Sequence, residues 1–206
     1  MAIILDKNSM YKKSFLYKKS LLIIIFLIFL CTNIVSYPTN VFSEESRGQK
    51  TKVKLPPPGT VIIWENGNYL DAIRNVTGSN LTHAAIVLYE KEVPLVYEAS
   101  RPNVHRYSFK DYVKIIKDTK KRLPQFSVHF LEPSTQYTKE QLVSMKRYAD
   151  SQLGRPFGVS SYLRGVPMQT IHCSEYVGHI LASSGRVKTI GERETPKTIC
   201  DKAKKL

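Results

Sequence analysis

The fold is decided by two apolar runs, Leu81-Thr82-His83-Ala84-Ala85-Ile86-Val87-Leu88-Tyr89 and Val93-Pro94-Leu95-Val96-Tyr97-Glu98-Ala99. Both are rich in β-branched and aromatic residues, which is typical of strands. Only a short polar stretch around Glu90-Lys91-Glu92 separates them, and so short a connection predicts an antiparallel hairpin. We therefore expect the two runs to pair within a central sheet.

The segments on either side of this hairpin complete the expected architecture. Apolar or alternating runs predict further strands at 61–64, 104–109 and 126–131. Helical periodicity and capping residues predict helices at 69–75, 111–118, 138–153 and 174–182, and a last one after Thr195-Pro196. Strands in the middle with helices flanking them indicate an α+β fold with a mostly antiparallel sheet.

Cys173 is the candidate nucleophile. It begins the predicted helix Cys-Ser-Glu-Tyr-Val-Gly-His-Ile-Leu, where free backbone N–H groups and the helix dipole lower the pKa of a thiol. The same N–H groups can stabilise an oxyanion. Cys200, in a basic terminal helix, has no comparable setting. A disulfide between the two cysteines is the alternative for an exported chain.

A nucleophilic cysteine needs a base, and the chain has five histidines. His83 is the preferred candidate because it opens a buried strand and can reach a cleft, and His105 is held in reserve. We expect the side chain of His172 to diverge from its neighbour Cys173 and that of His179 to lie on another helix face. His129 is expected on the solvated side of its strand.

Glu98 is the candidate partner for the base, since it interrupts an otherwise apolar strand. A symmetric turn centred between Glu90 and Lys91 places His83 directly opposite Glu98, within reach of a carboxylate–imidazole hydrogen bond. The inference depends on register, because a one-residue bulge turns Glu98 to the other face. Glu175 is the competing carboxylate, interpreted mainly as a favourable charge in a first helical turn.

Composition restricts the function classes. The 206 residues carry a net charge of +14, with 42% hydrophobic residues and three cysteines. Those values exclude a wholly disordered chain and a disulfide-dense scaffold, and they favour an anionic partner. Nucleic acid is not the expected one, because no groove-reading motif is present. Residues 1–43 account for +4 of the charge and the rest of the chain keeps +10.

The N-terminal segment is typical of a secretory signal. Lysines at 12, 13, 18 and 19 precede an apolar run from Leu21 to Cys31 that weakens toward Val35. The run is shorter than the roughly 20 apolar residues of a spanning helix. We expect cleavage near Ser43, with an uncleaved membrane anchor through 21–35 as the alternative. The expected organisation is a signal at 1–43, a basic proline-rich linker at 44–58 and one domain at 59–206.

Five segments, in their order along the chain, resemble the circularly permuted papain-like hydrolases, in particular the YiiX-like group related to NlpC-type peptidases and to lecithin:retinol acyltransferase. They are Pro58-Gly59-Thr60-Val61-Ile62, Leu81-Thr82-His83-Ala84-Ala85-Ile86-Val87, Val96-Tyr97-Glu98-Ala99, Gly154-Arg155-Pro156-Phe157 and His172-Cys173-Ser174-Glu175-Tyr176-Val177. Each segment is too short to identify a family alone. Together they are specific to the permuted group, because histidine precedes cysteine, the reverse of the order in ordinary papain-like enzymes. Thr60 replaces a common aspartate, Phe157 replaces a usual tyrosine, and residues 158–171 have no counterpart in the pattern.

The resemblance implies a permuted papain-like fold in which Cys173 is the nucleophile, His83 the base and Glu98 its orienting residue, with a thioester intermediate. We expect no cofactor or metal, because one cysteine and dispersed histidines do not make the ligand spacing of a metal site. We expect an exported hydrolase that cleaves an amide bond in a cell-envelope peptide, associated with a membrane or an anionic wall polymer. A lipid acyltransferase or acylhydrolase, and a non-catalytic envelope-binding module, are the alternatives.

Overall fold

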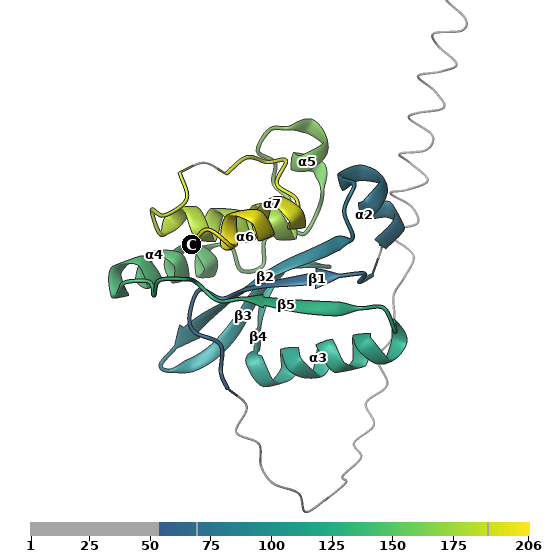
Figure 1. The fold of residues 1–206 in the computed structure, drawn as a ribbon. Coiled ribbons are helices and arrows are strands. Elements are labelled where there is room, and N and C mark those ends of the chain that lie inside the picture. Colours follow the sequence, from purple (N-terminus) through teal and green to yellow (C-terminus); the bar gives the residue numbers. More distant parts are fainter. Residues whose placement is uncertain (1–53, 69, 189) are drawn as a thin grey trace, which may run out of the picture. The chain divides into compact units, whose positions relative to one another are not determined.

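Five antiparallel strands form one sheet in the order β4-β3-β2-β1-β5 (Figure 1). The structure is a computed structural model that describes residues 54–206 except 69 and 189. The strands are β1 (Val61–Glu65), β2 (Leu81–Glu90), β3 (Val93–Ala99), β4 (Val104–Ser108) and β5 (Ser127–Leu131). The expected signal at 1–43, with Cys31 and the apolar run 21–35, and most of the expected linker lie outside the described residues.

Helices cover both faces of the sheet (Figure 1). They are α2 (Leu70–Thr77), α3 (Phe109–Arg122), α4 (Lys139–Ser151), α5 (Ser160–Arg164), α6 (Cys173–Ser183) and α7 (Pro196–Ala203). Helix α3 packs on one face, and α4, α6 and α7 pack on the other. The predicted α+β fold with a central antiparallel sheet is confirmed. The short helix α5 was not predicted.

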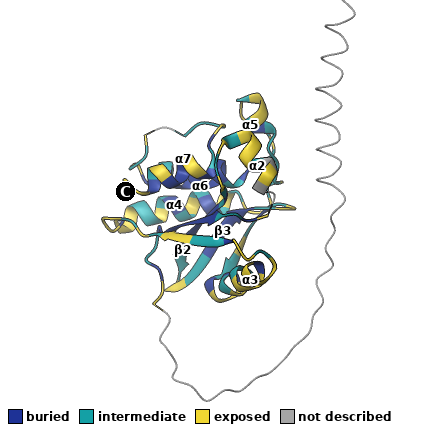
Figure 2. Ribbon diagram, turned by 45° about the vertical axis from the view of Figure 1, so that its right-hand side comes forward, coloured by how far each residue is buried: buried dark blue, intermediate teal, exposed yellow. Residues whose placement is uncertain are grey.

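The middle strand β2 is buried on both sides, so its alternate residues enter two different cores (Figure 2). Ala84 and Ile86 belong to the core beneath α4, α6 and α7. Ala85 and Val87 belong to the core beneath α3. A nearly continuous apolar run is what a strand buried on both faces requires.

Two helices begin where their capping residues predict. Thr138 starts α4 and Thr195 starts α7, each through a reciprocal capping box, and Pro196 occupies the first turn of α7. Such caps satisfy backbone N–H groups that have no partner within the helix. Among the described residues, no helix is long and apolar enough to cross a bilayer.

The predicted hairpin register is wrong by two residues. Strand β2 pairs Ala85 with Glu98, and the turn consists of Lys91 and Glu92, whose φ angles are 47° and 67°. Both turn residues are therefore left-handed, as in the two-residue turns that match the twist of paired strands. The turn lies one residue later than predicted, which shifts the pairing by two. Because strand side chains alternate with a period of two, His83 and Glu98 still share a face.

Candidate active site

Cys173 is the first residue of α6, and its surroundings favour the thiolate. The thiol is partly buried. Burial alone would raise its pKa, but the neighbouring imidazoles of His83 and His172 outweigh burial and lower the pKa well below its ordinary value of 9.0. A thiolate is the nucleophilic form of cysteine. The helix start predicted at Cys173 therefore coincides with an electropositive thiol environment.

His83 and Glu98 form a direct hydrogen bond. The imidazole Nε2 lies 2.8 Å from Oε2 of Glu98, and the two side chains are only 13% and 8% exposed. Burial would lower the pKa of His83, but the charge of Glu98 and then that of Cys173 prevail and raise it to about 10. Burial likewise opposes ionisation of Glu98, and its two histidine neighbours hold its pKa far below the ordinary range. The pair is therefore an imidazolium and a carboxylate at neutral pH.

The strand register explains how this pair forms without direct opposition. His83 lies opposite Trp64 of β1, whereas Glu98 lies opposite Ala85 on one side and His105 on the other. His83 and Glu98 are thus diagonal neighbours on adjacent strands, a separation that long side chains can bridge. The small side chain of Ala85 lies opposite Glu98 on the same face, which leaves room for the bond.

Glu98 has two further donors besides His83. Nε2 of His105 lies 3.0 Å from Oε1, and the hydroxyl of Ser100 donates to the same oxygen at 2.9 Å. The other ring nitrogen of His105 lies 2.7 Å from the backbone oxygen of Asn103. Two histidines therefore contact one carboxylate, one at each oxygen. His105, the second candidate for the base in the sequence analysis, therefore lies in the site, but Glu98 lies between it and His83.

Aromatic side chains enclose the His83–Glu98 pair. The ring of Trp64 meets that of His83 edge-on at 5.1 Å between centroids, and Phe126 packs against Trp64 at 5.0 Å. Tyr112 is fully buried on the same side, where burial first and then Glu98 raise the pKa of its phenol. Excluding water strengthens the electrostatic interactions within the pair.

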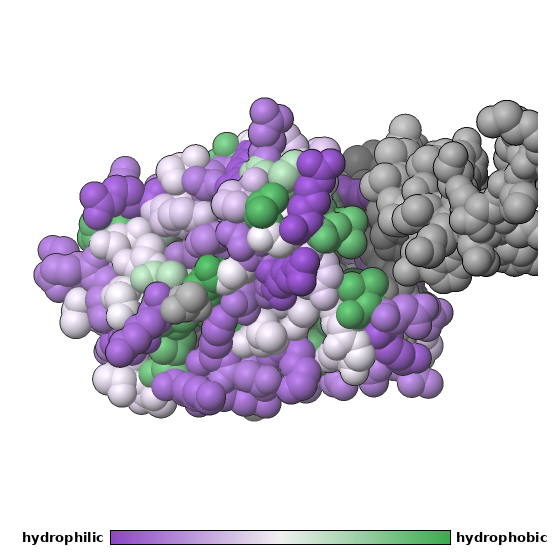
Figure 3. Space-filling view, turned by 90° about the horizontal axis from the view of Figure 1, so that it is seen from above, coloured by the Kyte–Doolittle hydropathy of each residue, from purple (hydrophilic) through white to green (hydrophobic). Residues whose placement is uncertain are grey.

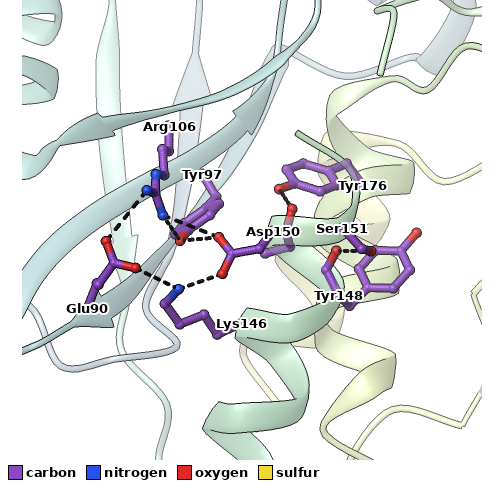
Figure 4. A network of polar contacts seen from close by, with 9 residues as sticks. Glu90, Tyr97, Arg106, Lys146, Tyr148, Asp150, Ser151 and Tyr176 are labelled. Carbon is purple, nitrogen blue, oxygen red and sulfur yellow. Dashed lines mark hydrogen bonds and ion pairs between the residues drawn. The ribbon is translucent and has the colours of Figure 1, made fainter. Parts of the chain in front are cut away.

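The opposite face of β3 and β4 is fixed to α4 by a polar network (Figure 4). Asp150 accepts hydrogen bonds from the hydroxyl of Tyr97 at 2.9 Å, from Arg106 at 3.3 Å and from Lys146 at 2.5 Å. Glu90 contacts Arg106 at 3.5 Å and Lys146 at 3.1 Å. Tyr97 and Arg106 oppose each other in the ladder immediately beside Glu98 and His105. The network therefore holds the strands that carry the site.

Residues 158–171, for which the sequence pattern offered no interpretation, lie next to the start of α6. The Arg155 guanidinium donates to backbone oxygens of Met168, Gln169 and Thr170. The hydroxyl of Ser161 in α5 donates to Glu175 at 2.5 Å. Glu175, the carboxylate that competes with Glu98 in the sequence analysis, is buried and accepts this hydrogen bond from α5.

His172 is a residue that sequence reasoning set aside wrongly. Its Nδ1 accepts the N–H of Glu175 at 3.4 Å, and its Nε2 donates to the backbone oxygen of Glu192 at 3.0 Å. In that position it caps α6 and lies near enough to Cys173 to lower the pKa of the thiol. Adjacent side chains diverge within a helix, but His172 precedes the helix in extended backbone.

The remaining candidates lie away from the site. His129 pairs at 2.9 Å with Glu65 on β1 and is 46% exposed, as expected for the solvated side of its strand. His179 packs on Tyr148. Cys173 and Cys200 are both free thiols. Within the described part of the chain, no group of three or more His, Cys, Asp and Glu side chains is placed to hold a metal ion.

The similarity of this chain to known proteins lies in structure. No family model matches the chain, and no curated protein matches it in sequence. The chain is similar to the solved structure of the metalloprotein YiiX from Escherichia coli O157:H7, DUF1105, with 21% identity and a TM-score of 0.49. The match covers 63% of this chain and 66% of YiiX, just under two thirds of that protein's length. This is a partial likeness in structure at low sequence identity.

Proposed function

We propose that the described domain is a cysteine hydrolase in which Cys173 is the nucleophile, His83 the general base and Glu98 the residue that orients His83. The observation that carries the proposal is the buried hydrogen bond from Nε2 of His83 to Glu98. A carboxylate that accepts at Nε2 fixes the tautomer and leaves Nδ1 to exchange a proton with the thiol.

The chemistry follows from these assignments. The Cys173 thiolate attacks the carbonyl carbon of the substrate, a carbon–sulfur bond forms, and the carbonyl oxygen becomes an oxyanion. As that intermediate collapses, the His83 imidazolium gives its proton to the leaving amine, and a thioester remains on Cys173. Water then attacks the thioester, His83 takes a proton from it, and the acid product leaves as the carbon–sulfur bond breaks.

The first turn of α6 supplies a place for the oxyanion. Backbone N–H groups at a helix start point outward and carry the positive end of the helix dipole. The side chain of His172 accepts a hydrogen bond from the backbone N–H of Glu175, and the backbone oxygen of His172 accepts one from the N–H of Tyr176. The N–H groups of Cys173 and Ser174 precede these in the same turn. We assign oxyanion stabilisation to them.

We further propose that the protein is exported and cleaves an amide bond in a cell-envelope peptide. Two features of the sequence support this: an apolar leader with a basic start, and a net charge of +10 beyond residue 43. A positively charged surface raises the local concentration of anionic envelope material. The face of the domain drawn in Figure 3 is largely hydrophilic, with separate apolar patches.

Cleavage or transfer of a lipid acyl chain is the second candidate, and one observation favours it. Leu163 in α5 and Val166 just after it are 53% and 49% exposed. The Ser161–Glu175 hydrogen bond holds this segment against the first turn of α6, which begins at Cys173. Exposed apolar residues beside a nucleophile are suited to an acyl chain.

The two candidates and the non-catalytic alternative are separated by one set of assays. Wild-type protein, Cys173→Ala and the matched control Cys200→Ala are incubated in parallel with peptidoglycan fragments and with phospholipid vesicles. We expect release of new amino groups from the peptide substrate by the wild type and by Cys200→Ala, and none by Cys173→Ala. Iodoacetamide should modify Cys173 in the native protein, as read by peptide mass spectrometry.

Each contrary result has a definite meaning. Turnover retained by Cys173→Ala rejects the nucleophile. Fatty-acid release without peptide cleavage moves the assignment to the lipid enzyme. A Cys173 that resists iodoacetamide, together with salt-sensitive retention on wall material, favours the binding module.

A further inference from the structure

We propose that His105 is a positively charged positioning residue, an imidazolium that shares the carboxylate of Glu98 with His83. The inference rests on the proposed function, because it assigns His105 a role in setting the basicity of the proposed base. The sequence had offered His105 only as a substitute for His83. The structure gives the two histidines different positions on the same carboxylate.

A count of donors and acceptors gives the protonation state of His105. One ring nitrogen lies 2.7 Å from the backbone oxygen of Asn103, which can only accept. The other lies 3.0 Å from Glu98 and 3.4 Å from the Ser100 hydroxyl. That hydroxyl gives its proton to Glu98, so it too presents an acceptor to the ring. Both ring nitrogens therefore donate, and a histidine with two donors is a cation.

Glu98 is suited to hold two cations. An ionised carboxylate has about four acceptor positions on its two oxygens. His83 donates to one oxygen, and His105 and Ser100 donate to the other. A protonated Glu98 would present a proton of its own to these donors. The arrangement therefore requires the carboxylate, and the carboxylate in turn keeps both rings charged.

The groups around His105 support the same state. Its side chain is 22% exposed, and its ring meets that of Tyr107 edge-on at 4.8 Å. The titratable groups facing this cluster are Glu98 from β3, His83 from β2, Tyr107 from its own strand, Tyr112 from α3 and Cys173 from α6. Burial acts to lower the pKa of His105, but the hydrogen bond and the charge of Glu98 raise it above its ordinary value.

The shared carboxylate has a consequence for His83. The positive charge of His105 opposes protonation of His83, because two like charges repel. It therefore offsets part of the rise in the pKa of His83 that Glu98 causes. A base held too strongly in its protonated form releases its proton to the leaving amine less readily. His105 thus moderates the basicity of His83 while it holds Glu98 in place. It touches neither substrate nor Cys173 in this role.

Nuclear magnetic resonance of the full chain, with ¹⁵N-labelled histidine, tests the charge directly. Ring nitrogens of a cation and of either neutral tautomer have distinct chemical shifts. We expect both nitrogens of His105 to be protonated at pH 7. A neutral His105 at pH 7 overturns the proposal without any variant.

Three variants then test the effect on His83. His105→Gln keeps a donor for Glu98 and removes the charge, and it should raise the pKa of His83 by about one unit. His105→Lys keeps the charge and should restore the wild-type titration. The matched control is His129→Gln, which breaks the exposed pair of His129 with Glu65 and should leave His83 unchanged. A purely structural role for His105 predicts equal His83 titrations in the Gln and Lys variants, and that result overturns the proposal.

The same samples separate this proposal from the proposed function. If wild-type Cys173 reacts with iodoacetamide as an ordinary thiol, with a pKa near 9.0, the nucleophile assignment fails. If Cys173 reacts as a thiolate at neutral pH but His105→Gln leaves the titration of His83 unchanged, only the role of His105 fails.

Discussion

Two polar clusters lie back to back on strands β3 and β4. On one face, Glu98 holds His83 and His105. On the other, Asp150 and Glu90 hold Arg106 and Lys146 (Figure 4). Glu98 is 8% exposed, whereas Asp150 and Glu90 are 35% and 41% exposed. Neighbouring positions in one ladder thus place similar ion pairs in two different dielectric environments.

The two clusters differ in how strongly their charges depend on one another. In the exposed network, water screens each pair, and such pairs contribute about 0–1 kcal/mol to stability. In the buried cluster, each charge depends on its neighbours, because a buried charge without a partner is strongly unfavourable. The exposed network fixes strands in place. The buried cluster sets the protonation states of His83 and Cys173.

The largest expected effect comes from Glu98→Gln. An amide accepts at its oxygen but donates at its nitrogen, so it cannot accept from both His83 and His105. We expect turnover to fall about 10³-fold or more and the free energy of unfolding to fall by about 3 kcal/mol. Urea denaturation and the assay on peptidoglycan fragments measure the two losses. A variant of wild-type stability would show that the buried charges do not depend on Glu98.

An intermediate effect is expected from pH. The pKa of His83 is raised to about 10, so its imidazolium, and the stability it contributes, is fully present below pH 6.5 and is lost as pH rises through about 10. The pKa of Glu98 is lowered, so its contribution is present above pH 4.5 and is lost as pH falls through its folded value. Turnover should therefore decline toward pH 10.

The alkylation rate of Cys173 measures how much of this thiol is ionised beside His83. Because the pKa of Cys173 is lowered well below 9.0, its reaction with iodoacetamide should gain much less between pH 7 and pH 9 than that of an ordinary thiol. An ordinary thiol would instead gain about 50-fold between pH 7 and pH 9. A gain of that size in the native protein contradicts the ion pair.

The smallest effect is expected from Asp150→Asn. This substitution removes charge from the exposed network and keeps the side-chain shape, so the free energy of unfolding should fall by about 1 kcal/mol or less. The alkylation rate of Cys173 and its pH profile should match the wild type. A changed profile would mean that the two faces of β3 and β4 are coupled and that the exposed network also influences Cys173.

Sequence reasoning reached most of the secondary structure because the signals were local. The capping residues Thr138 and Thr195 mark the starts of α4 and α7, and the apolar run at 82–88 lies within β2. Helix α5 was missed because five residues, Ser160–Arg164, carry too little periodicity to predict a helix. The hairpin turn was displaced by one residue, since Glu90-Lys91-Glu92 holds no glycine or asparagine to mark the left-handed positions.

The sequence by itself determined the identities of the candidate residues: a cysteine at a helix start, a histidine opening a buried strand and a glutamate on an apolar one. Only the tertiary structure decided their partners. Strand pairing put Glu98 diagonal to His83 and directly opposite His105, and the extended backbone before α6 put His172 beside Cys173. Local patterns fix which face a side chain occupies, whereas contacts between strands depend on register, and register is set by the whole sheet.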